Sequence, residues 1–237
     1  MLTFTLVLEV VVLLALPVAV GFWMRRRLGT AWGLFFSGAL AYVAAQMVSA
    51  VLGSPLLGGL PAGPAGGLIA ALVAALAQEM ARYGLYRFFL RDVRAGREAL
   101  MVGAGHGGAE MVIIGLLLLL TLFQFLSFRN ADLTMLDLSP EEQDQIRQIV
   151  ADFWTTPWFV PLLRLLHQLL IAPFHLVASL FVMWSVTQRR WDYLAGMVGL
   201  HLLLYLSQGL GPISALTVAG LFAAGSLAYL RHHWSAF

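Results

Sequence analysis

The sequence predicts an all-α integral membrane protein, folded as a single bundle of about seven transmembrane helices. Of its 237 residues, 60% are hydrophobic and only 11% are charged, and the mean hydropathy is +0.85. A soluble domain has roughly 45–50% apolar and about 25% charged residues. This composition excludes a secreted enzyme, a disordered tail and a nucleic-acid-binding module. Spans of about 20 residues with short loops account for residues 1–237 as one polytopic membrane domain.

Seven apolar runs, separated by proline, glycine or charged residues, are long enough to cross a bilayer. They occupy about residues 2–24, 31–52, 68–90, 99–126, 158–186, 193–210 and 213–230. The first run ends at Arg25-Arg26-Arg27, whereas a cleaved signal peptide carries its positive charge before the apolar run. The first span is therefore expected to be an uncleaved anchor. The Pro/Gly-rich stretch SPLLGGLPAGPAGG predicts the turn between the second and third spans.

The distribution of arginine predicts the orientation, because cytoplasmic loops carry an excess of basic residues. All 14 basic residues are arginine. With the N-terminus outside, ten are on the cytoplasmic side: Arg25, Arg26, Arg27, Arg87, Arg91, Arg94, Arg97, Arg189, Arg190 and Arg231. Only Arg129 and Arg147 are then outside. The C-terminus is thus expected in the cytoplasm of a bacterium, with the chain in its inner (plasma) membrane. The absence of cysteine excludes disulfides and thiolate chemistry.

The one long loop, at about residues 127–157, is expected on the outer side and carries six of the 12 acidic residues. Its segment SPEEQDQIRQIVADFW predicts a short amphipathic surface helix. Ser139 can cap that helix, Pro140 suits its first turn, and Glu142 stands at the capping-box position. Two interpretations remain open, a lid resting on the outer rim of the bundle and a gate for substrate.

Ionisable side chains within the spans are unusually frequent, although charged types cost at least about 2.5–3.5 kcal/mol each in hydrocarbon. They are Glu9, Glu79, Arg82, His106, Glu110, Arg164, His167, His175 and His201. Glu79, His106, His175 and His201 come from four spans and are expected within a layer roughly 10 Å thick. The pattern predicts one functional cavity, the alternative being polar contacts that only join helices. Glu9 and Arg164 are expected to neutralise each other nearer the outer surface.

Two spacings suggest chemistry. Glu79 and Arg82 are three residues apart, so they share a helix face and can form an ion pair. His106 and Glu110, in the segment GHGGAE, are four residues apart, a spacing at which two ligands can share a metal ion, as in HExxH helices. The four glycines that surround His106 permit either close helix packing or room for a substrate.

These residues together resemble the YhfC-like intramembrane metalloproteases, distant relatives of the CAAX-prenyl-protease and bacteriocin-processing (CPBP) superfamily. The likeness covers about residues 68–206, and GHGGAE is its most specific segment. Glu79 and Arg82 match the first motif of the superfamily, His175 the next, and His201 the last. Many members have two adjacent glutamates, whereas Gln78 precedes Glu79 here. Tyr205 stands where the last motif has asparagine or aspartate.

The resemblance implies an intramembrane peptidase that hydrolyses a peptide bond of a membrane-embedded or membrane-proximal protein. The lipid bilayer is its other expected partner, and no nucleic-acid partner is expected. In a glutamate scheme without cofactor, Glu79 is the general base, Arg82 orients it, and His175 and His201 hold the water or the oxyanion. In a metal scheme, zinc binds the set His106, Glu110, His175 and His201. The rivals are a proton- or cation-coupled transporter or channel, and a non-enzymatic membrane scaffold.

Overall fold

The computed structural model describes residues 1–58, 63–129, 131–135 and 137–234, and every regular element in these ranges is helical. The elements are α1 (Leu2–Leu28), α2 (Trp32–Gly58), α3 (Pro64–Gly84), the π-helical turn η1 (Leu85–Phe89), α4 (Gly96–Arg129), the 3-10 turn η2 (Leu133–Met135), α5 (Pro140–Thr155), α6 (Val160–Thr187), α7 (Trp191–Gly209) and α8 (Pro212–His233). The predicted all-α class is confirmed. The centre of the predicted Pro/Gly-rich turn, residues 59–62, is outside the described residues.

Six of the described helical segments are long and apolar enough to cross a membrane, rather than the seven expected. They are α1, α2, α3 with η1, α4, α6 and α8. The predicted sixth span is present as the 19-residue helix α7, but Asp192, His201 and Gln208 lower its hydropathy. The chain is thus a multi-pass membrane protein with six candidate spans, and α7 is a more polar helix packed beside them.

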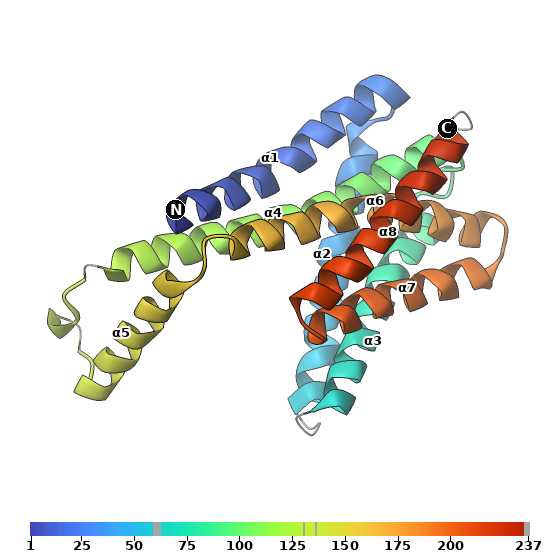
Figure 1. Cartoon of the computed structure of the whole chain (residues 1–237). Coiled ribbons are helices and arrows are strands. Elements are labelled where there is room, and N and C mark those ends of the chain that lie inside the picture. The colour runs from blue at the N-terminus through green and yellow to red at the C-terminus, as the bar shows by residue number, and fades with distance from the viewer. Residues whose placement is uncertain (59–62, 130, 136, 235–237) are drawn as a thin grey trace.

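The helices run between the two ends of the bundle, and the N-terminus and the C-terminus lie at opposite ends (Figure 1). At the end near the C-terminus, Trp23 of α1 stacks on Trp234, with ring centroids 6.0 Å apart. At the same end Tyr83 of α3 stacks on Trp191 at the start of α7, at 5.1 Å. The other end holds the N-terminus and α5, which follows the far end of α4 (Figure 1).

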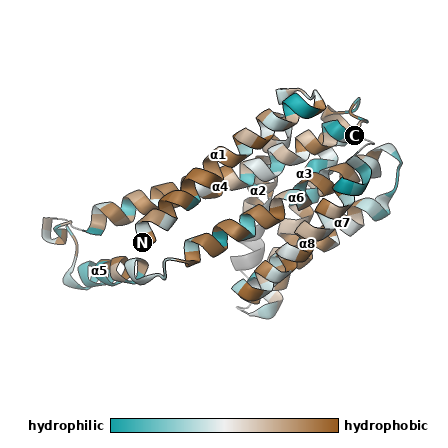
Figure 2. Ribbon diagram, turned by 45° about the horizontal axis from the view of Figure 1, so that its top comes forward, coloured by the Kyte–Doolittle hydropathy of each residue, from teal (hydrophilic) through white to brown (hydrophobic). Residues whose placement is uncertain are grey.

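The long helices are largely apolar along their length (Figure 2), and charged side chains are nevertheless buried between them. Leu40, Leu120 and Leu221 are largely exposed, and Glu79 and Arg82 are fully buried. In water, both the exposed leucines and the buried charges would be unfavourable. Such a surface suits lipid, so the exposed leucines are expected to face the hydrocarbon.

Helices α2 and α4 approach so closely that their backbones touch. A Cβ atom added at Gly105 would lie 1.8 Å from the carbonyl oxygen of Phe35, and one added at Gly38 would lie 1.9 Å from that of Val102. Small residues permit this kind of helix contact in membranes. The glycines around the predicted site are therefore explained by packing, which fixes the position of the neighbouring residue His106.

Replacing Gly105 by alanine is expected to lower the free energy of unfolding by about 1–3 kcal/mol or more, because the new methyl group cannot fit unless a helix backbone moves. Thermal or denaturant unfolding in detergent measures the effect. Gly199→Ala in α7 is the matched control, since a Cβ there meets nothing within 4 Å. If the two variants were equally stable, the backbone contact would be contradicted.

The surface helix α5 begins as the sequence predicts. Ser139 Oγ accepts a hydrogen bond from the Glu142 amide at 3.2 Å, and Glu142 Oε2 accepts one from the Ser139 amide at 2.8 Å. The hydrogen bond that the Ser139 amide donates to the carboxylate of Glu142, followed by that of the Ser139 side chain, holds the pKa of Glu142 below its usual range. The helix has no buried residue, and Phe153 stacks on Phe125 of α4 at 4.0 Å. The guanidinium of Arg129 in α4 also lies over the ring of Trp154, 4.8 Å from its centroid. The C-terminal half of α5 therefore packs against the end of α4 through aromatic side chains.

Candidate functional site

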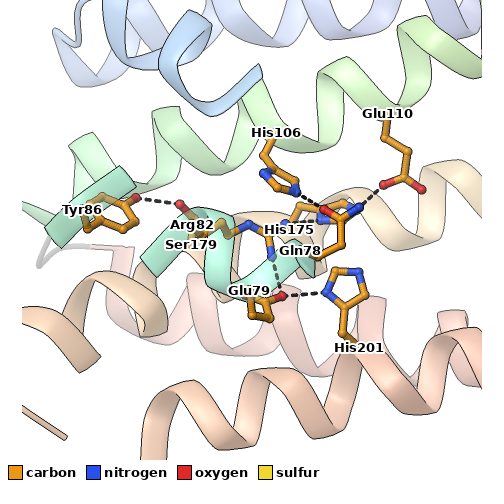
Figure 3. Close-up of polar contacts among 9 residues, drawn as sticks. All are labelled: Gln78, Glu79, Arg82, Tyr86, His106, Glu110, His175, Ser179 and His201. Carbon is orange, nitrogen blue, oxygen red and sulfur yellow. Dashed lines mark hydrogen bonds and ion pairs between the residues drawn. The ribbon is translucent and has the colours of Figure 1, made fainter. Parts of the chain in front are cut away.

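Helices α3, α4, α6 and α7, with the turn η1, gather a group of polar side chains inside the bundle (Figure 3). We call it the polar cluster; it comprises Gln78, Glu79, Arg82, Tyr86, His106, Glu110, His175, Ser179 and His201. All six residues singled out from the sequence, in the catalytic and the metal schemes alike, belong to it. The structure therefore brings together groups that are up to 122 residues apart in the chain.

Glu79 is at the centre of one branch of the cluster. Its Oε1 accepts hydrogen bonds from Arg82 NH1 at 2.5 Å and from His201 Nδ1 at 2.6 Å. The three-residue spacing on α3 sets the first contact, and α7 brings the second across the bundle. Because an ionised carboxylate only accepts, Nδ1 of His201 carries the hydrogen, and a neutral ring then has its lone pair on Nε2.

A second branch runs from Arg82 through His175 to Glu110. Arg82 NH2 is 2.6 Å from His175 Nδ1, and His175 Nε2 is 2.8 Å from Glu110 Oε2. Guanidinium has no acceptor, so His175 Nδ1 must accept this hydrogen bond. The hydrogen of the ring is then on Nε2 and is donated to Glu110. Arg82 thus fixes the tautomer of His175 as well as the position of Glu79.

Two further pairs complete the cluster. His106 Nε2 is 2.6 Å from Gln78 Oε1, which requires Nε2 to donate. The hydroxyl of Tyr86 is 2.7 Å from that of Ser179. Gln78, which precedes Glu79 on α3, therefore holds a histidine of α4 rather than supplying a second carboxylate.

Three atoms of the cluster have no hydrogen-bond partner among the described residues, although they are buried: Glu79 Oε2, Arg82 Nε and His106 Nδ1. Buried polar atoms in proteins are nearly always hydrogen-bonded. Two of the three belong to the same ion pair, one being an acceptor and the other a cationic N–H donor. That pair can therefore accept a proton at one atom and stabilise a negative oxygen at another.

The cluster is closed, which differs from the expected water-accessible cavity. Glu79, Arg82 and His106 are fully buried, and only Glu110 is partly open, with 18% of its side chain exposed. The reason is mutual satisfaction, because the carboxylates, the guanidinium and the histidines hydrogen-bond to one another. A reactant can reach them only when the helices move.

A cavity of about 580 Å³ is near Glu110 on the side toward the N-terminal end of α6. Three cluster residues each have a neighbour in the lining of this cavity, which lies one or two helical turns away on the same face of the same helix. The pairs are Glu110 and Ile114 on α4, His175 and Gln168 on α6, and His201 and Gln208 on α7. Glu9 and Arg164, also in the lining, form the predicted ion pair, with nitrogen–oxygen distances of 2.8 and 3.0 Å.

Comparison with known proteins decides the family. Residues 11–224 match the sequence model of one family, which is described as YhfC intramembrane metalloprotease. The chain belongs to the YhfC family. A protein of Bacillus subtilis (strain 168) described as uncharacterized membrane protein YhfC is 26% identical over 220 residues, covering 82% of each chain. No solved structure matches. The resemblance read from Glu79–Arg82, GHGGAE, His175 and His201 is therefore confirmed.

The YhfC family name implies a metal, and the residues of this chain, as arranged, do not fit one. In the described part of the chain, no group of three or more histidine, aspartate or glutamate side chains is arranged to hold a metal ion. The rings of His106 and His201 lie 5.6 and 5.7 Å from that of His175, but Nε2 of His106 bonds Gln78 and Nδ1 of His201 bonds Glu79. The guanidinium of Arg82 bonds both Glu79 and His175 and would repel a dication held there. In this arrangement the predicted ligands hydrogen-bond to other side chains of the polar cluster.

Several members and neighbours of the polar cluster in this YhfC-family chain were not among the predicted site residues. Tyr205 stacks on His201 at 5.2 Å, and Tyr42 of α2 meets His106 edge-on at 5.3 Å. Tyr86 is four residues after Arg82, and Tyr205 is four residues after His201. Helical spacing would have found these two tyrosines, whereas nothing in the local sequence indicates Tyr42.

Proposed function

We propose that this protein is an intramembrane peptidase that uses Glu79 as its general base. The observation that carries the proposal is the buried Glu79–Arg82 pair, in which Oε2 and Nε are both unpartnered. Membership of a family described as intramembrane metalloproteases supports peptide hydrolysis as the reaction class. The substrate would be a membrane-embedded or membrane-proximal protein segment.

In the proposed reaction a water molecule donates a proton to Glu79 Oε2 as its oxygen attacks the carbonyl carbon of the scissile bond. The carbonyl oxygen becomes negative and is stabilised by the Nε–H of Arg82, a cationic donor. The C–N bond then breaks as Glu79 returns the proton to the leaving amine. The cycle leaves Glu79 ionised again and produces a carboxyl and an amino terminus.

The histidines would act by positioning the pair. His201 holds Oε1, so Oε2 is the oxygen that faces a reactant. His175 and Glu110 hold the other amino group of Arg82, which keeps the guanidinium plane fixed. The cluster contains two carboxylates and one permanent cation. Taking up one proton therefore brings its net charge from −1 to zero, which favours proton transfer in a medium of low dielectric constant.

The cavity beside Glu110 is the proposed approach for the substrate. It is mostly apolar, as a membrane segment requires, and it adds the side chains of His167, Gln168 and Gln208, which can bond an extended peptide backbone. The arginine asymmetry supports an orientation with the N-terminus outside and the C-terminus in the cytoplasm. In that orientation the cavity opens toward the outer leaflet of a bacterial inner membrane.

The proposal is tested by comparing new protein N-termini in the membranes of cells that express the wild type, Glu79→Gln or Asp192→Asn. Asp192→Asn makes the same carboxylate-to-amide change at an exposed residue that pairs with Arg190. Cleavage products are expected with the wild type and with Asp192→Asn, and not with Glu79→Gln. If no product depends on Glu79 while proton or cation flux does, the transporter reading replaces the peptidase.

Removal of metal separates the two chemical schemes. Because at least one nitrogen of each cluster histidine and one oxygen of Glu79 are bonded to protein partners, and Arg82 contacts both Glu79 and His175, cleavage by the purified protein is expected to survive incubation with a strong zinc chelator. Loss of cleavage, with recovery on adding back zinc, would contradict the glutamate scheme and support the set His106, Glu110, His175 and His201.

A further inference from the structure

A second polar feature lies beyond the polar cluster, toward the end of the bundle that holds the C-terminus. It is a cavity of about 350 Å³ between η1, the segment after it, and the end of α6. Four arginines line it, Arg87, Arg91, Arg94 and Arg189, and we call it the arginine pocket. Tyr86 also lines it, and its hydroxyl is bonded to Ser179 of the polar cluster. The pocket is thus separated from Arg82 by one helical turn of α3 and η1.

The charge of the arginine pocket is not compensated by the protein. None of its four arginines forms an ion pair with a carboxylate in the described part of the chain, and no acidic residue lines the cavity. By contrast, Arg82, Arg147, Arg164 and Arg190 each have an acidic partner. Guanidinium groups gathered without counter-charge repel one another, and a phosphate relieves this by accepting paired N–H bonds.

Two departures from regular helix shape the walls of the pocket. On one side η1 is a π-helical turn, closed by a hydrogen bond from Leu90 N to Leu85 O at 2.9 Å, and it carries Arg87. Such turns occur frequently at functional sites. On the other side Arg189 is left-handed, with φ of 56°, at a position after a helix that glycine usually occupies. The chain thus holds an arginine in an unfavourable backbone conformation at the rim of the pocket.

Beside the arginines are large apolar side chains. Phe88 lines the pocket and is 60% exposed, and its neighbour Phe89 is 80% exposed. Both are at the end of the span formed by α3 and η1. Aromatic residues at that level lie at the boundary between headgroups and hydrocarbon. An anion that enters here thus meets apolar surface on the membrane side.

We propose that the arginine pocket binds the phosphate of an anionic phospholipid, with its acyl chains against Phe88 and Phe89. Basic pockets between transmembrane helices recognise lipid headgroups in this way. The assignment does not depend on peptidase activity, because it rests on a different end of the bundle. The occupant is a phosphodiester with a net negative charge, so a zwitterionic lipid with the same chains should bind more weakly.

The test uses the full chain, purified and delipidated in a non-ionic detergent, and native mass spectrometry to count bound lipids. Dioleoylphosphatidylglycerol and dioleoylphosphatidylcholine are the two probes. The wild type is expected to prefer the glycerol lipid, and Arg87→Gln/Arg91→Gln should weaken that binding on the order of tenfold. Arg25→Gln/Arg26→Gln is the matched control, since it removes the same charge from the exposed last turn of α1 and should leave binding unchanged.

A second variant guards against loss of fold. Arg189→Gly removes one guanidinium and relieves the left-handed backbone, so the protein should unfold no more easily while its affinity for the anionic lipid falls. Equal loss in the Arg25→Gln/Arg26→Gln control, or equal binding of the two lipids by the wild type, would overturn the proposal. Displacement of the lipid by millimolar inorganic phosphate would assign the pocket to a soluble phosphate instead.

Discussion

Glu79→Gln is expected to lower the rate of peptide cleavage by about 10²–10⁴-fold, the range for loss of a general base. Glutamine preserves the shape and can still accept from Arg82 and His201 at its carbonyl oxygen. It replaces Oε2, the unpartnered oxygen, by an amide nitrogen that cannot take a proton. The rate should be measured with purified protein in lipid vesicles and a membrane-spanning peptide substrate.

Asp192→Asn is the control for this experiment, because it makes the same chemical change far from the cluster at an exposed helix start. Its rate should equal that of the wild type. A Glu79→Gln protein that cleaves as fast as the wild type, with the same products, would remove Glu79 from the chemistry. The pattern of loss across Glu79 and Asp192 thus distinguishes a catalytic carboxylate from a general effect of charge.

The second large effect is expected on stability. Arg82→Gln should destabilise the protein by about 3–5 kcal/mol, because removal of one partner leaves a buried charge uncompensated. Arg82 is fully buried and donates to both Glu79 and His175, so two acceptors lose their donor at once. Unfolding by a denaturing detergent, followed by circular dichroism, measures the loss.

A double variant shows whether the ion pair is the cause. Glu79→Gln/Arg82→Gln removes both charges and leaves two amides that can bond each other, so it should be more stable than Arg82→Gln alone. Arg190→Gln is the control, since Arg190 pairs with Asp192 at an exposed site, where such pairs contribute little. If the double variant were less stable than Arg82→Gln, the destabilisation would have another source.

The sequence was sufficient for the positions of the helices because hydropathy and capping are local signals. The predicted span 158–186 is α6, Val160–Thr187, and the predicted span 213–230 lies within α8, Pro212–His233. The capping box of Ser139 and Glu142 is present. The common depth of Glu79, His106, His175 and His201 could also be predicted, because depth follows from counting residues along a helix.

The partners within the cluster could not be predicted in the same way. Which atoms meet depends on how each helix is rotated about its axis and how closely it approaches its neighbours. The backbone contact of Gly105 with Phe35 sets both for α4, and a glycine-rich segment alone does not reveal what it touches. For this reason the pairing of Gln78 with His106 and the closure of the site were not foreseen. The lower hydropathy of α7 likewise comes in part from a residue, His201, that faces the interior.

The closure of the polar cluster makes reaction conditional on a rare conformation. With Glu79 and Arg82 fully buried, only the fraction of molecules whose helices have parted can take a substrate. Each 1.4 kcal/mol of opening free energy lowers that fraction tenfold and weakens the apparent affinity by the same factor. Changes that loosen the contact between helices without touching the cluster would therefore speed the proposed cleavage, so that membrane thickness and lateral pressure would regulate it.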